Sequence, residues 1–600
     1  MTIRVRFRLM LMLFVTAAFS LPGSEAAVVR PIDISRAFNS AAPQINLRQM
    51  VQECPNFISY PGHDGVIWLK QHTYQIDTSG SKSVTTVWVI LGKSEIEEKW
   101  LDWNIRIPKD GGAQIFEASL YDPGSLTKIE NISPQRKENE WHINFGDVPE
   151  EFILVLSYRQ TYANNLFIQD MLWLNESLPV WEQSIIAEVE SGRDFEYVTN
   201  ADIEPSISNE GISDVYKWMI INQTPSPPRS LRTDSRAWLA FGNRQPLSSF
   251  IKLLENYAKM PVPTPPSNVE TWLKKGDFSS FFNWLNEQET DDSILRDGIP
   301  EKAPWSRREK SIVASSWINR FNSDTCRLFW RLAVDPSQNG FANESIILGA
   351  AIEIKRRRET FFYEVGQLYE PGNTSLSLVG EAIYAPLESG GLDKRLIPPR
   401  GASDNRLSVT WDLNVAEDNT ITGSVSLTIR NLWKDFLLSN MDANEILAEI
   451  IGRATTGTDI KTSRVRGGAT EISAPLKPGK IIFSGTNAII PLNPPQPGWL
   501  RELAMAMTPY SIKFPMSMEA IYRINLPPNV RDVFPPPQID RDEGKVKYSE
   551  KYEYFKRRGR LDVTSRLTLS STRMDHGMDQ DIAFAIGRFG MQRTIPLRMR

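Results

Sequence analysis

The chain has 600 residues, of which 41% are apolar and 23% are charged, and its formal net charge is −4. That length exceeds what one hydrophobic core fills, so roughly two to four domains are expected, and the composition excludes wholesale disorder. A general nucleic-acid binder is also excluded, because affinity for phosphates needs a basic surface. The chain contains 4 histidines and 2 cysteines, which excludes a disulfide-stapled fold, an array of zinc fingers and a His-rich metal centre. We therefore expect no metal and no cofactor.

The N-terminus has the pattern of an export signal. Three arginines lie in the first eight residues, and an apolar run extends from Leu9 to Leu21. This run is too short to cross a hydrocarbon core of roughly 30 Å, and small residues follow it up to Ala26, as signal peptidases require. We expect residues 1–26 to be a signal peptide cleaved after Ala26, so that the protein is periplasmic or secreted. No later stretch approaches 18 unbroken apolar residues, so we expect no transmembrane span after cleavage.

Export also bears on the two cysteines, Cys54 and Cys326. In an oxidising compartment they could pair and clamp two domains together. Because they lie far apart in the chain, we interpret them as two unpaired thiols, with the disulfide as the alternative.

Residues 27–230 are expected to form an N-terminal β-rich domain. Apolar residues alternate with period two in Thr85–Leu91, Trp141–Phe145 and Phe152–Tyr158, and turn residues separate these runs. This pattern is typical of an antiparallel sheet or β-sandwich. The proline-rich segment Thr224–Pro228 then predicts an extended linker at the end of the domain.

Residues 231–395 change to helical spacing and then return to strands. Apolar residues recur every three or four positions in Ser248–Ala258, Val269–Leu273, Phe278–Leu285 and Ile312–Ile318. The N-cap cluster Ser323-Asp324-Thr325 predicts a further helix that runs through Val334, with Cys326 in its first turn. Ile346–Ile354 and Thr360–Val365 are expected to be the strands of a hairpin.

Residues 396–600 are expected to form a C-terminal β-rich domain. Leu407–Leu413, Thr422–Ile429 and Arg560–Ser571 alternate clearly, and Ala443–Ile451 predicts one helix among them. The expected fold class is therefore α+β multidomain. It comprises an antiparallel β-sandwich-like N-terminal domain, an α+β middle domain and a β-rich C-terminal domain.

A family resemblance is carried by several local stretches in a fixed order along the chain. They are Leu178-Pro179-Val180, Val215–Trp218, Ser235–Trp238, Tyr369–Gly372 and Leu378–Ala382. Together they resemble a bacterial exported family that joins a β-rich domain of unknown function, a transglutaminase-like domain and a C-terminal β-domain. The resemblance implies that residues 231–395 adopt a transglutaminase-like, papain-like α+β fold.

Active members of that family use a cysteine, a histidine and an aspartate. A helix N-terminus favours the thiolate, the histidine takes the thiol proton, and the acid orients the histidine. The resemblance places Cys326 at the nucleophile, Glu344 at the position of the histidine and Glu364 at the position of the acid. The thiol is therefore retained, and a carboxylate replaces the base.

No histidine lies close to Cys326 in the sequence to act as its base. The histidines of the chain are His63, His72, His142 and His576. None lies between residues 240 and 400. Carboxylates beside a thiol raise its pKa, and the loss of a general base costs roughly 10²–10⁴-fold in rate. We expect Cys326, Glu344 and Glu364 to be vestigial, inactive positions, with Cys326 a small buried core residue.

The leading hypothesis is an exported cell-envelope protein whose transglutaminase-like domain does not catalyse and instead binds or scaffolds a peptide or protein partner. One alternative is an active Cys-dependent acyltransferase or peptidase, completed by a distant histidine. The other is a glycan-binding envelope protein, because tryptophans crowd the first domain and indole rings stack on sugar faces. These tryptophans are Trp68, Trp88, Trp100, Trp103, Trp141, Trp173 and Trp181.

Overall fold

The computed structural model describes residues 32–33 and 42–599 with internal gaps. The gaps are residues 77–79, 109–110, 138, 164–166, 224, 226–236, 291–297, 322–325, 357–358, 370–372, 440, 456–458, 466–467, 485–486, 496, 506–509 and 576. The expected signal peptide, most of the expected linker and the expected N-cap cluster therefore lie outside the described residues. Within the described part of the chain, no helix is long and apolar enough to cross a membrane.

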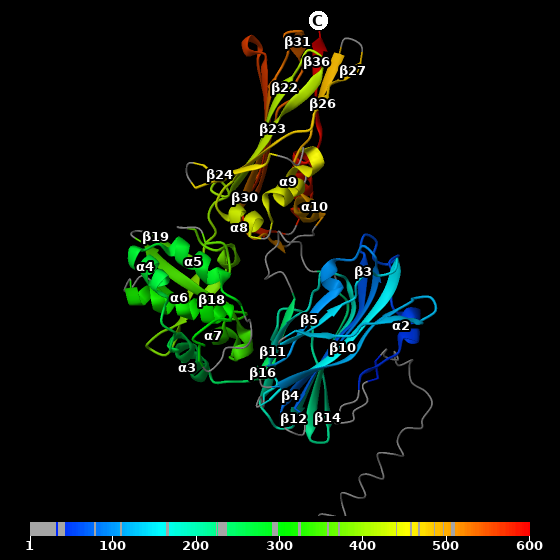
Figure 1. The fold of residues 1–600 in the computed structure, drawn as a ribbon, viewed down its shortest axis with the longest axis vertical. Coiled ribbons are helices and arrows are strands. Elements are labelled where there is room, and N and C mark those ends of the chain that lie inside the picture. The colour runs from blue at the N-terminus through cyan, green and yellow to red at the C-terminus, as the bar shows by residue number, and fades with distance from the viewer. Residues whose placement is uncertain are drawn as a thin grey trace, which may run out of the picture. The chain divides into compact units, whose positions relative to one another are not determined.

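The chain divides into two compact units, and its architecture is α+β and mostly strand (Figure 1). The first unit comprises Met1–Ile168, Glu176–Ser191 and Ile203–Pro225. The second comprises Gln169–Asn175, Gly192–Asp202 and Ser226–Arg600. The multidomain, β-rich fold class is confirmed at this level. The finer boundaries expected at residues 230 and 395 stay predictions.

One sheet of the first unit is built from long strands that carry apolar side chains on both faces. In pairing order the strands are β14 (Ser206–Glu210), β15 (Ser213–Gln223), β12 (Val180–Glu190), β3 (Gly65–Ile76), β4 (Lys82–Lys93), β10 (Glu151–Tyr162), β6 (Gly111–Tyr121) and β7 (Lys128–Asn131). Along β4, Trp88 and Ile90 enter one core, while Val87, Val89 and Leu91 enter the other. Two cores form because successive side chains of a strand point to opposite faces.

A small sheet and a short helix supply further apolar side chains to these two cores. The small sheet pairs β5 (Asp102–Arg106), β9 (Glu140–Asn144) and β8 (Gln135–Lys137), preceded by the 3-10 helix η1 (Glu98–Trp100). Ile105 and Ile143 of this sheet enter the same core as Trp88. On the other core lies α2 (Leu47–Glu53), which contributes Met50.

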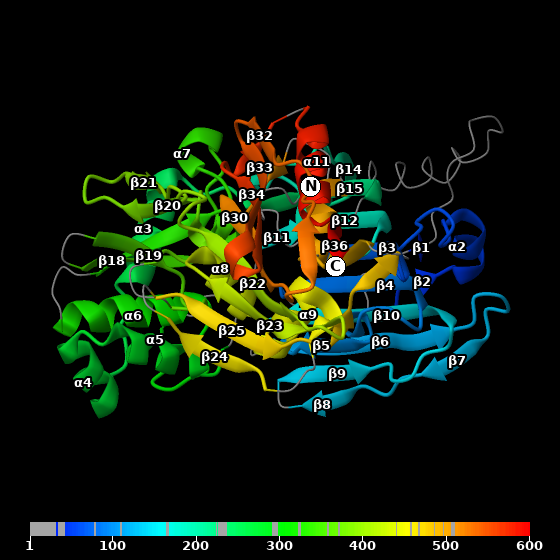
Figure 2. The same cartoon turned by 90° about the horizontal axis from the view of Figure 1, so that it is seen from above.

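The middle part of the second unit combines helices with an antiparallel sheet and is called the middle region here (residues 238–397). Its sheet has the order β19 (Glu359–Tyr363), β18 (Ile347–Arg356), β17 (Cys326–Leu332), β20 (Ala382–Pro386) and β21 (Leu392–Leu396). The helices are α3 (Leu247–Ala258), α4 (Ser267–Lys275), α5 (Phe278–Glu287), α6 (Arg307–Phe321) and α7 (Pro336–Asn339). The four helices expected between residues 248 and 318 and the expected hairpin are found, and α6 packs on β17 and β18. Figure 2 shows α6 beside the hairpin of β18 and β19.

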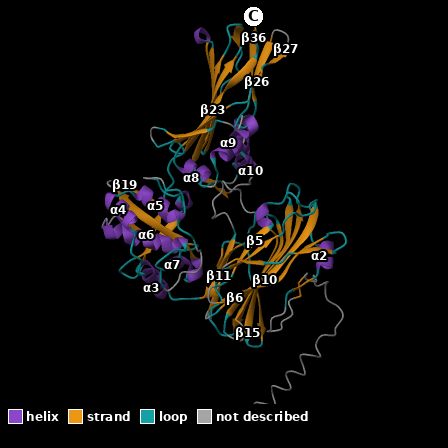
Figure 3. Cartoon of the chain, viewed as in Figure 1, coloured by secondary structure: helices purple, strands orange, loops and turns teal. Residues whose placement is uncertain are grey.

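Shorter elements of the second unit accompany the middle region. A small sheet pairs β11 (Asp170–Trp173), β16 (Trp238–Asn243) and β13 (Phe195–Thr199), and the 3-10 helices are η3 (Glu344–Ile346) and η4 (Leu376–Leu378). Figure 3 shows one group of helices in the middle region and a second group in the residues that follow it.

The helix expected to run through Val334 is wrong, because Cys326–Leu332 is strand β17. Cys326, Leu328, Trp330 and Leu332 enter the core beneath α6, whereas Phe329 enters a core on the other face. The segment thus alternates with period two, and this burial outweighs the local N-cap signal.

The C-terminal region (residues 405–599) is built on a long sheet. Its pairing order is β24 (Lys461–Arg464), β25 (Thr470–Pro475), β23 (Thr420–Ile429), β22 (Arg406–Val415), β30 (Met516–Asn525), β34 (Arg560–Leu569), β33 (Val546–Phe555) and β32 (Ile539–Glu543), with β26 (Gly479–Lys480) beside β23. A second sheet orders β27 (Ile482–Ser484), β28 (Asn487–Leu492), β36 (Arg593–Met599) and β31 (Val530–Val533), and β29 (Tyr510–Ser511) pairs with β35 (Arg573–Met574). The helices are α8 (Leu432–Leu438), α9 (Ala443–Ile451), α10 (Gly498–Met505) and α11 (Asp579–Phe589). The expected strands and the expected helix are found.

A buried ion pair links β33, in the long sheet, to β36, the last strand of this region. Arg593 of β36 lies 3.3 Å from a carboxylate oxygen of Glu550 on β33, and their side chains are 5% and 3% exposed. Arg593 also donates to the hydroxyl groups of Tyr548 (2.8 Å) and Ser565 (2.9 Å), while Tyr548 and Tyr552 donate to Glu550. Every charged group of this network therefore has polar partners inside the core.

Removing one charge of this pair is expected to destabilise the protein strongly. Arg593→Met leaves Glu550 buried without its cation and should lower the free energy of unfolding by about 3–5 kcal/mol. Urea denaturation of the full chain measures this change.

Lys547→Gln is the matched control, because Lys547 and Asp542 form an exposed pair 2.5 Å apart. It should cost no more than about 1 kcal/mol. Equal losses for the two variants would contradict a stabilising role for the buried pair.

Candidate functional site

Cys326, the expected nucleophile, is the first residue of strand β17 and lies in an apolar core. Its side chain is 8% exposed. The side-chain amide of Asn319 on α6 makes two hydrogen bonds to the backbone of Cys326. It accepts from the Cys326 amide (3.0 Å) and donates to the Cys326 carbonyl (2.7 Å). Burial raises the pKa of the Cys326 thiol to about 12, and the charge of Glu353 adds to the rise. Such a thiol is protonated at neutral pH and is a poor nucleophile.

Glu344, at the position expected for the histidine, opens the 3-10 helix η3. Its carboxylate accepts a hydrogen bond of 2.7 Å from the hydroxyl of Tyr257 on α3. The preceding residue, Asn343, is fully buried and caps this turn by accepting from the amide of Ser345 (2.8 Å). Its amide group also donates to the carbonyl of Asn243 on β16 (2.8 Å). The backbone at Glu344 is therefore fixed by a buried side chain next to it.

Glu364, at the position expected for the acid, follows the last residue of β19 and is held by an arginine. One terminal nitrogen of Arg331 lies 2.7 and 2.9 Å from the two carboxylate oxygens, and the hydroxyl of Ser377 also donates to Glu364. The side chains of Arg331 and Glu364 are 15% and 13% exposed. The carboxylate thus belongs to an ion pair, and within the described part of the chain no histidine hydrogen-bonds to it.

The sheet keeps the three expected site residues apart. Cys326 enters the core beneath α6, whereas Glu364 and Arg331 follow Phe362 and Phe329 by two residues, on the opposite face of the sheet. Cys326 pairs with Ile354, while Leu332 pairs with Ile347, so Glu344 lies beyond the far end of the β17–β18 pair. No common site contains Cys326, Glu344 and Glu364.

The helix that packs on β17 and β18, α6, is preceded by a buried serine. Ser306 precedes α6; its amide donates to a carboxylate oxygen of Glu309 (2.7 Å), and its hydroxyl accepts from the amide of Glu309 (3.1 Å). This reciprocal pair is a capping box, which stabilises a helix start. Both residues are buried. The start of α6 is thus fixed by buried side-chain hydrogen bonds, whereas Cys326, expected at a helix N-terminus, lies on strand β17.

Asp435 is a buried carboxyl next to Glu364 that the sequence did not point to. It lies on α8 and accepts from the amide of Leu376 (2.7 Å) and the hydroxyl of Ser439 (2.9 Å). Burial raises the pKa of Asp435, and the negative charge of Glu364 adds to the rise. Neither periodicity nor spacing marks Asp435, because a polar residue in a short apolar helix has no distinct signature in sequence.

Two of the histidines are held within the sheets of the first unit. The ring of His72 on β3 is 3.2 Å from the hydroxyl of Thr86, and burial lowers its pKa to about 3. His142 on β9 lies 3.0 Å from Asn104 and 3.2 Å from Asp102. His576 lies outside the described residues.

Comparisons with known proteins give a likeness of fold alone. No protein-family model matches the chain, and no curated protein matches it significantly. A crystal structure described as a "putative protease" from Parabacteroides distasonis is similar over 89% of this chain and 99% of that one, with a TM-score of 0.54 and 8% identity. An M1 zinc metallopeptidase from Deinococcus radiodurans matches 30% of this chain and 42% of its own length, with a TM-score of 0.20 and 7% identity. The first comparison shows a shared multidomain architecture, and the second is too weak to use.

Cys326 is expected to resist alkylation in the folded protein. With a pKa of about 12, roughly one thiol in 10,000 is ionised at pH 8, and the thiolate is the reactive form. Iodoacetamide labelling followed by peptide mass spectrometry should detect modified Cys326 only after denaturation. The Cys54→Ser variant removes the other thiol from the measurement. Rapid labelling of Cys326 at pH 6 would contradict this environment.

Asp435 is expected to make stability fall as the pH rises. Because its pKa is raised in the folded state, the folded protein keeps this proton over a pH range in which the unfolded chain has lost it. The stabilisation is present below the ordinary aspartate pKa near 4 and is lost as the pH rises through the raised value. Calorimetric Tm values between pH 4 and 7 should show that Asp435→Asn removes this component.

Asp418→Asn serves as a control of opposite sign, because hydrogen bonds from Thr420 lower the pKa of Asp418. Because the pKa of Asp418 is lowered, the stability of the wild type relative to that variant should rise with pH only below the ordinary aspartate pKa near 4, and the two should run level between pH 4 and 7. The Tm series for this variant therefore extends down to about pH 2. If both variants give the same pH dependence, the assignment to Asp435 fails.

Proposed function

We propose that this chain is an exported cell-envelope protein whose transglutaminase-like middle region does not catalyse and instead binds or scaffolds a peptide or protein partner. The observation that carries the proposal is the separation of Cys326 and Glu364 on opposite faces of one sheet. A cysteine hydrolase or acyltransferase needs thiol, base and acid within hydrogen-bond reach. The raised thiol pKa and the Arg331–Glu364 ion pair support the same conclusion.

The transglutaminase-like assignment itself rests on the sequence resemblance and on the order of elements. Four helices, α3 to α6, precede the hairpin of β18 and β19, which is the order of elements in the resemblance, although Cys326 lies on strand β17 and not at a helix start. The fold likeness to the Parabacteroides distasonis protein is compatible with a peptidase ancestry. At 8% identity it does not transfer an activity to this chain.

The glycan-binding alternative loses its main argument. It requires exposed tryptophans, yet all 17 tryptophans lie among the described residues and are buried or half-buried. In the first unit, Trp88, Trp100 and Trp103 pack against one another with ring centroids 5.4–5.9 Å apart. Their indole rings therefore form core and leave no open stacking platform.

Expression with the native first 26 residues tests export and catalysis together. We expect a periplasmic product whose mass corresponds to a start at Ala27. Amine incorporation into casein and hydrolysis of a fluorogenic peptide should equal the blank for both the wild type and Cys326→Ser, because the thiol lacks a base.

A Cys54→Ser variant controls for nonspecific thiol effects. Activity that survives Cys54→Ser and disappears in Cys326→Ser would overturn the non-catalytic proposal. A cytoplasmic product of full mass would overturn the proposed location while leaving the conclusion about catalysis standing.

A further inference from the structure

The C-terminal region contains a cavity of about 270 Å³ that no site described above uses. Its floor is a pair of stacked rings, Trp411 on β22 and Tyr522 on β30, with centroids 4.5 Å apart and an angle of 11° between their planes. The two residues are register partners on neighbouring parallel strands, so the sheet itself places the rings face to face. The hydroxyl of Tyr522 donates to the carbonyl of Asn493 (2.8 Å), which fixes the ring. The two rings thus form a rigid part of the cavity wall and are themselves almost fully buried, at 4% and 1% exposure.

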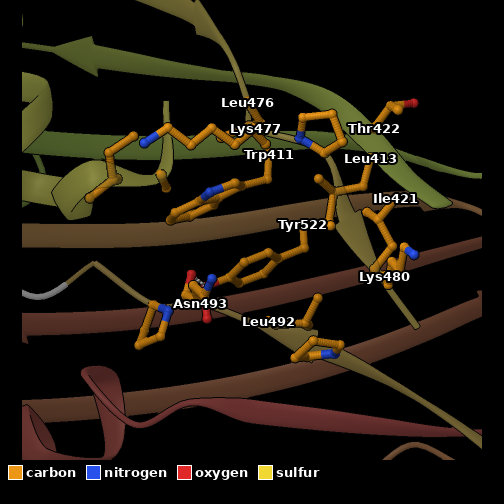
Figure 4. A pocket seen from close by; sticks show the side chains of 16 residues that line it. Trp411, Leu413, Ile421, Thr422, Leu476, Lys477, Lys480, Leu492, Asn493 and Tyr522 are labelled. Carbon is orange, nitrogen blue, oxygen red and sulfur yellow. Dashed lines mark hydrogen bonds between the residues drawn. The ribbon is translucent and has the colours of Figure 1, made fainter. Parts of the chain in front are cut away.

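The walls of the cavity are apolar and come from segments far apart in the sequence. The apolar lining includes Leu413, Ile421, Leu476, Pro491 and Leu492. Figure 4 shows Leu413 and Ile421 beside each other and Leu492 below Tyr522. An engineered apolar cavity of about 150 Å³ already holds a benzene molecule. The larger volume here therefore has room for one aromatic ring with a short chain.

The charged side chains that line the cavity are both lysines. Lys477 passes above Trp411, and Lys480 lies on the other side, beside Ile421 (Figure 4). No acidic residue lines the cavity among the residues that the structure describes there. Asp418, in the preceding turn, is near enough to Lys480 to feel its charge, although hydrogen bonds from Thr420 affect Asp418 more strongly. The mouth of the cavity therefore favours a negatively charged group.

From this geometry we propose that the cavity binds a small aromatic carboxylate. The ring of the ligand fills the apolar part of the cavity beside Trp411, and its carboxylate faces a lysine at the mouth. Burial of the ligand ring among apolar side chains supplies affinity, and the charge selects an acid over a neutral or basic analogue. The site does not depend on the middle region or on its lack of catalysis.

Calorimetric titration of the full mature chain with three probes tests the proposal. They are 3-phenylpropionate, 3-phenylpropanol and 3-phenylpropylamine, which share one body and differ in charge. We expect saturable binding that is strongest for the acid and weakest for the amine. Replacing either lysine by glutamine, Lys477→Gln or Lys480→Gln, should weaken binding of the acid by up to about fivefold and leave the alcohol unchanged.

Two further variants distinguish binding in this cavity from binding elsewhere on the protein. Ala454→Phe fills space at the wall, where the structure uses only the Ala454 carbonyl to accept from the amide of Lys477 (2.9 Å), and it should abolish binding of the acid. Lys461→Gln removes an exposed lysine on β24 away from the cavity and should have no effect.

The proposal is overturned if the acid shows no saturable binding, if the alcohol binds as tightly as the acid, or if the two lysine variants act no differently from Lys461→Gln. It is also overturned if a folded Ala454→Phe protein, judged by its circular dichroism, binds the acid normally. Should Ala454→Phe not fold, the comparison of the lysine variants alone decides.

Discussion

The alternation of side chains along β-strands is the constraint on which most of this structure depends. In the middle region it sends Cys326 to one face of the sheet and Glu364, with Arg331, to the other. No rotation of a side chain can join groups that a strand holds on opposite faces. The chemistry available to the middle region is thus limited by backbone register before any pKa is considered.

In the C-terminal region the same alternation of side chains brings residues together instead of separating them. Trp411 and Tyr522 occupy matching positions of neighbouring strands, so their rings stack on the inner face. Glu550 on β33 also points inward, where Arg593 neutralises it, whereas Glu519 is buried next to Arg406 and Arg566 at the outer face. Both of these buried glutamates therefore have an arginine supplied by a segment distant in sequence.

Local periodicity predicted much of the secondary structure. The helices α3 to α6 and α9 and the strands β4, β10, β22 and β23 were all evident, because each carries a long, regular apolar pattern. The segment from Cys326 to Leu332 was assigned wrongly. Its N-cap cluster was a strong local signal for a helix, but its apolar residues serve two cores at once, and only strand geometry allows that.

The sequence by itself determined the β-rich multidomain class, the pattern of an export signal and the lack of a histidine between residues 240 and 400, because periodicity, composition and position are local properties. Only the tertiary structure decided that Cys326 is buried with a raised pKa, that Arg331 holds Glu364, and that Asp435 lies close enough for Glu364 to raise its pKa. The cavity over Trp411 and Tyr522 was also invisible in sequence. Contacts of this kind join residues separated by tens to more than a hundred positions, and strand register and burial, which no local pattern encodes, set which of them meet.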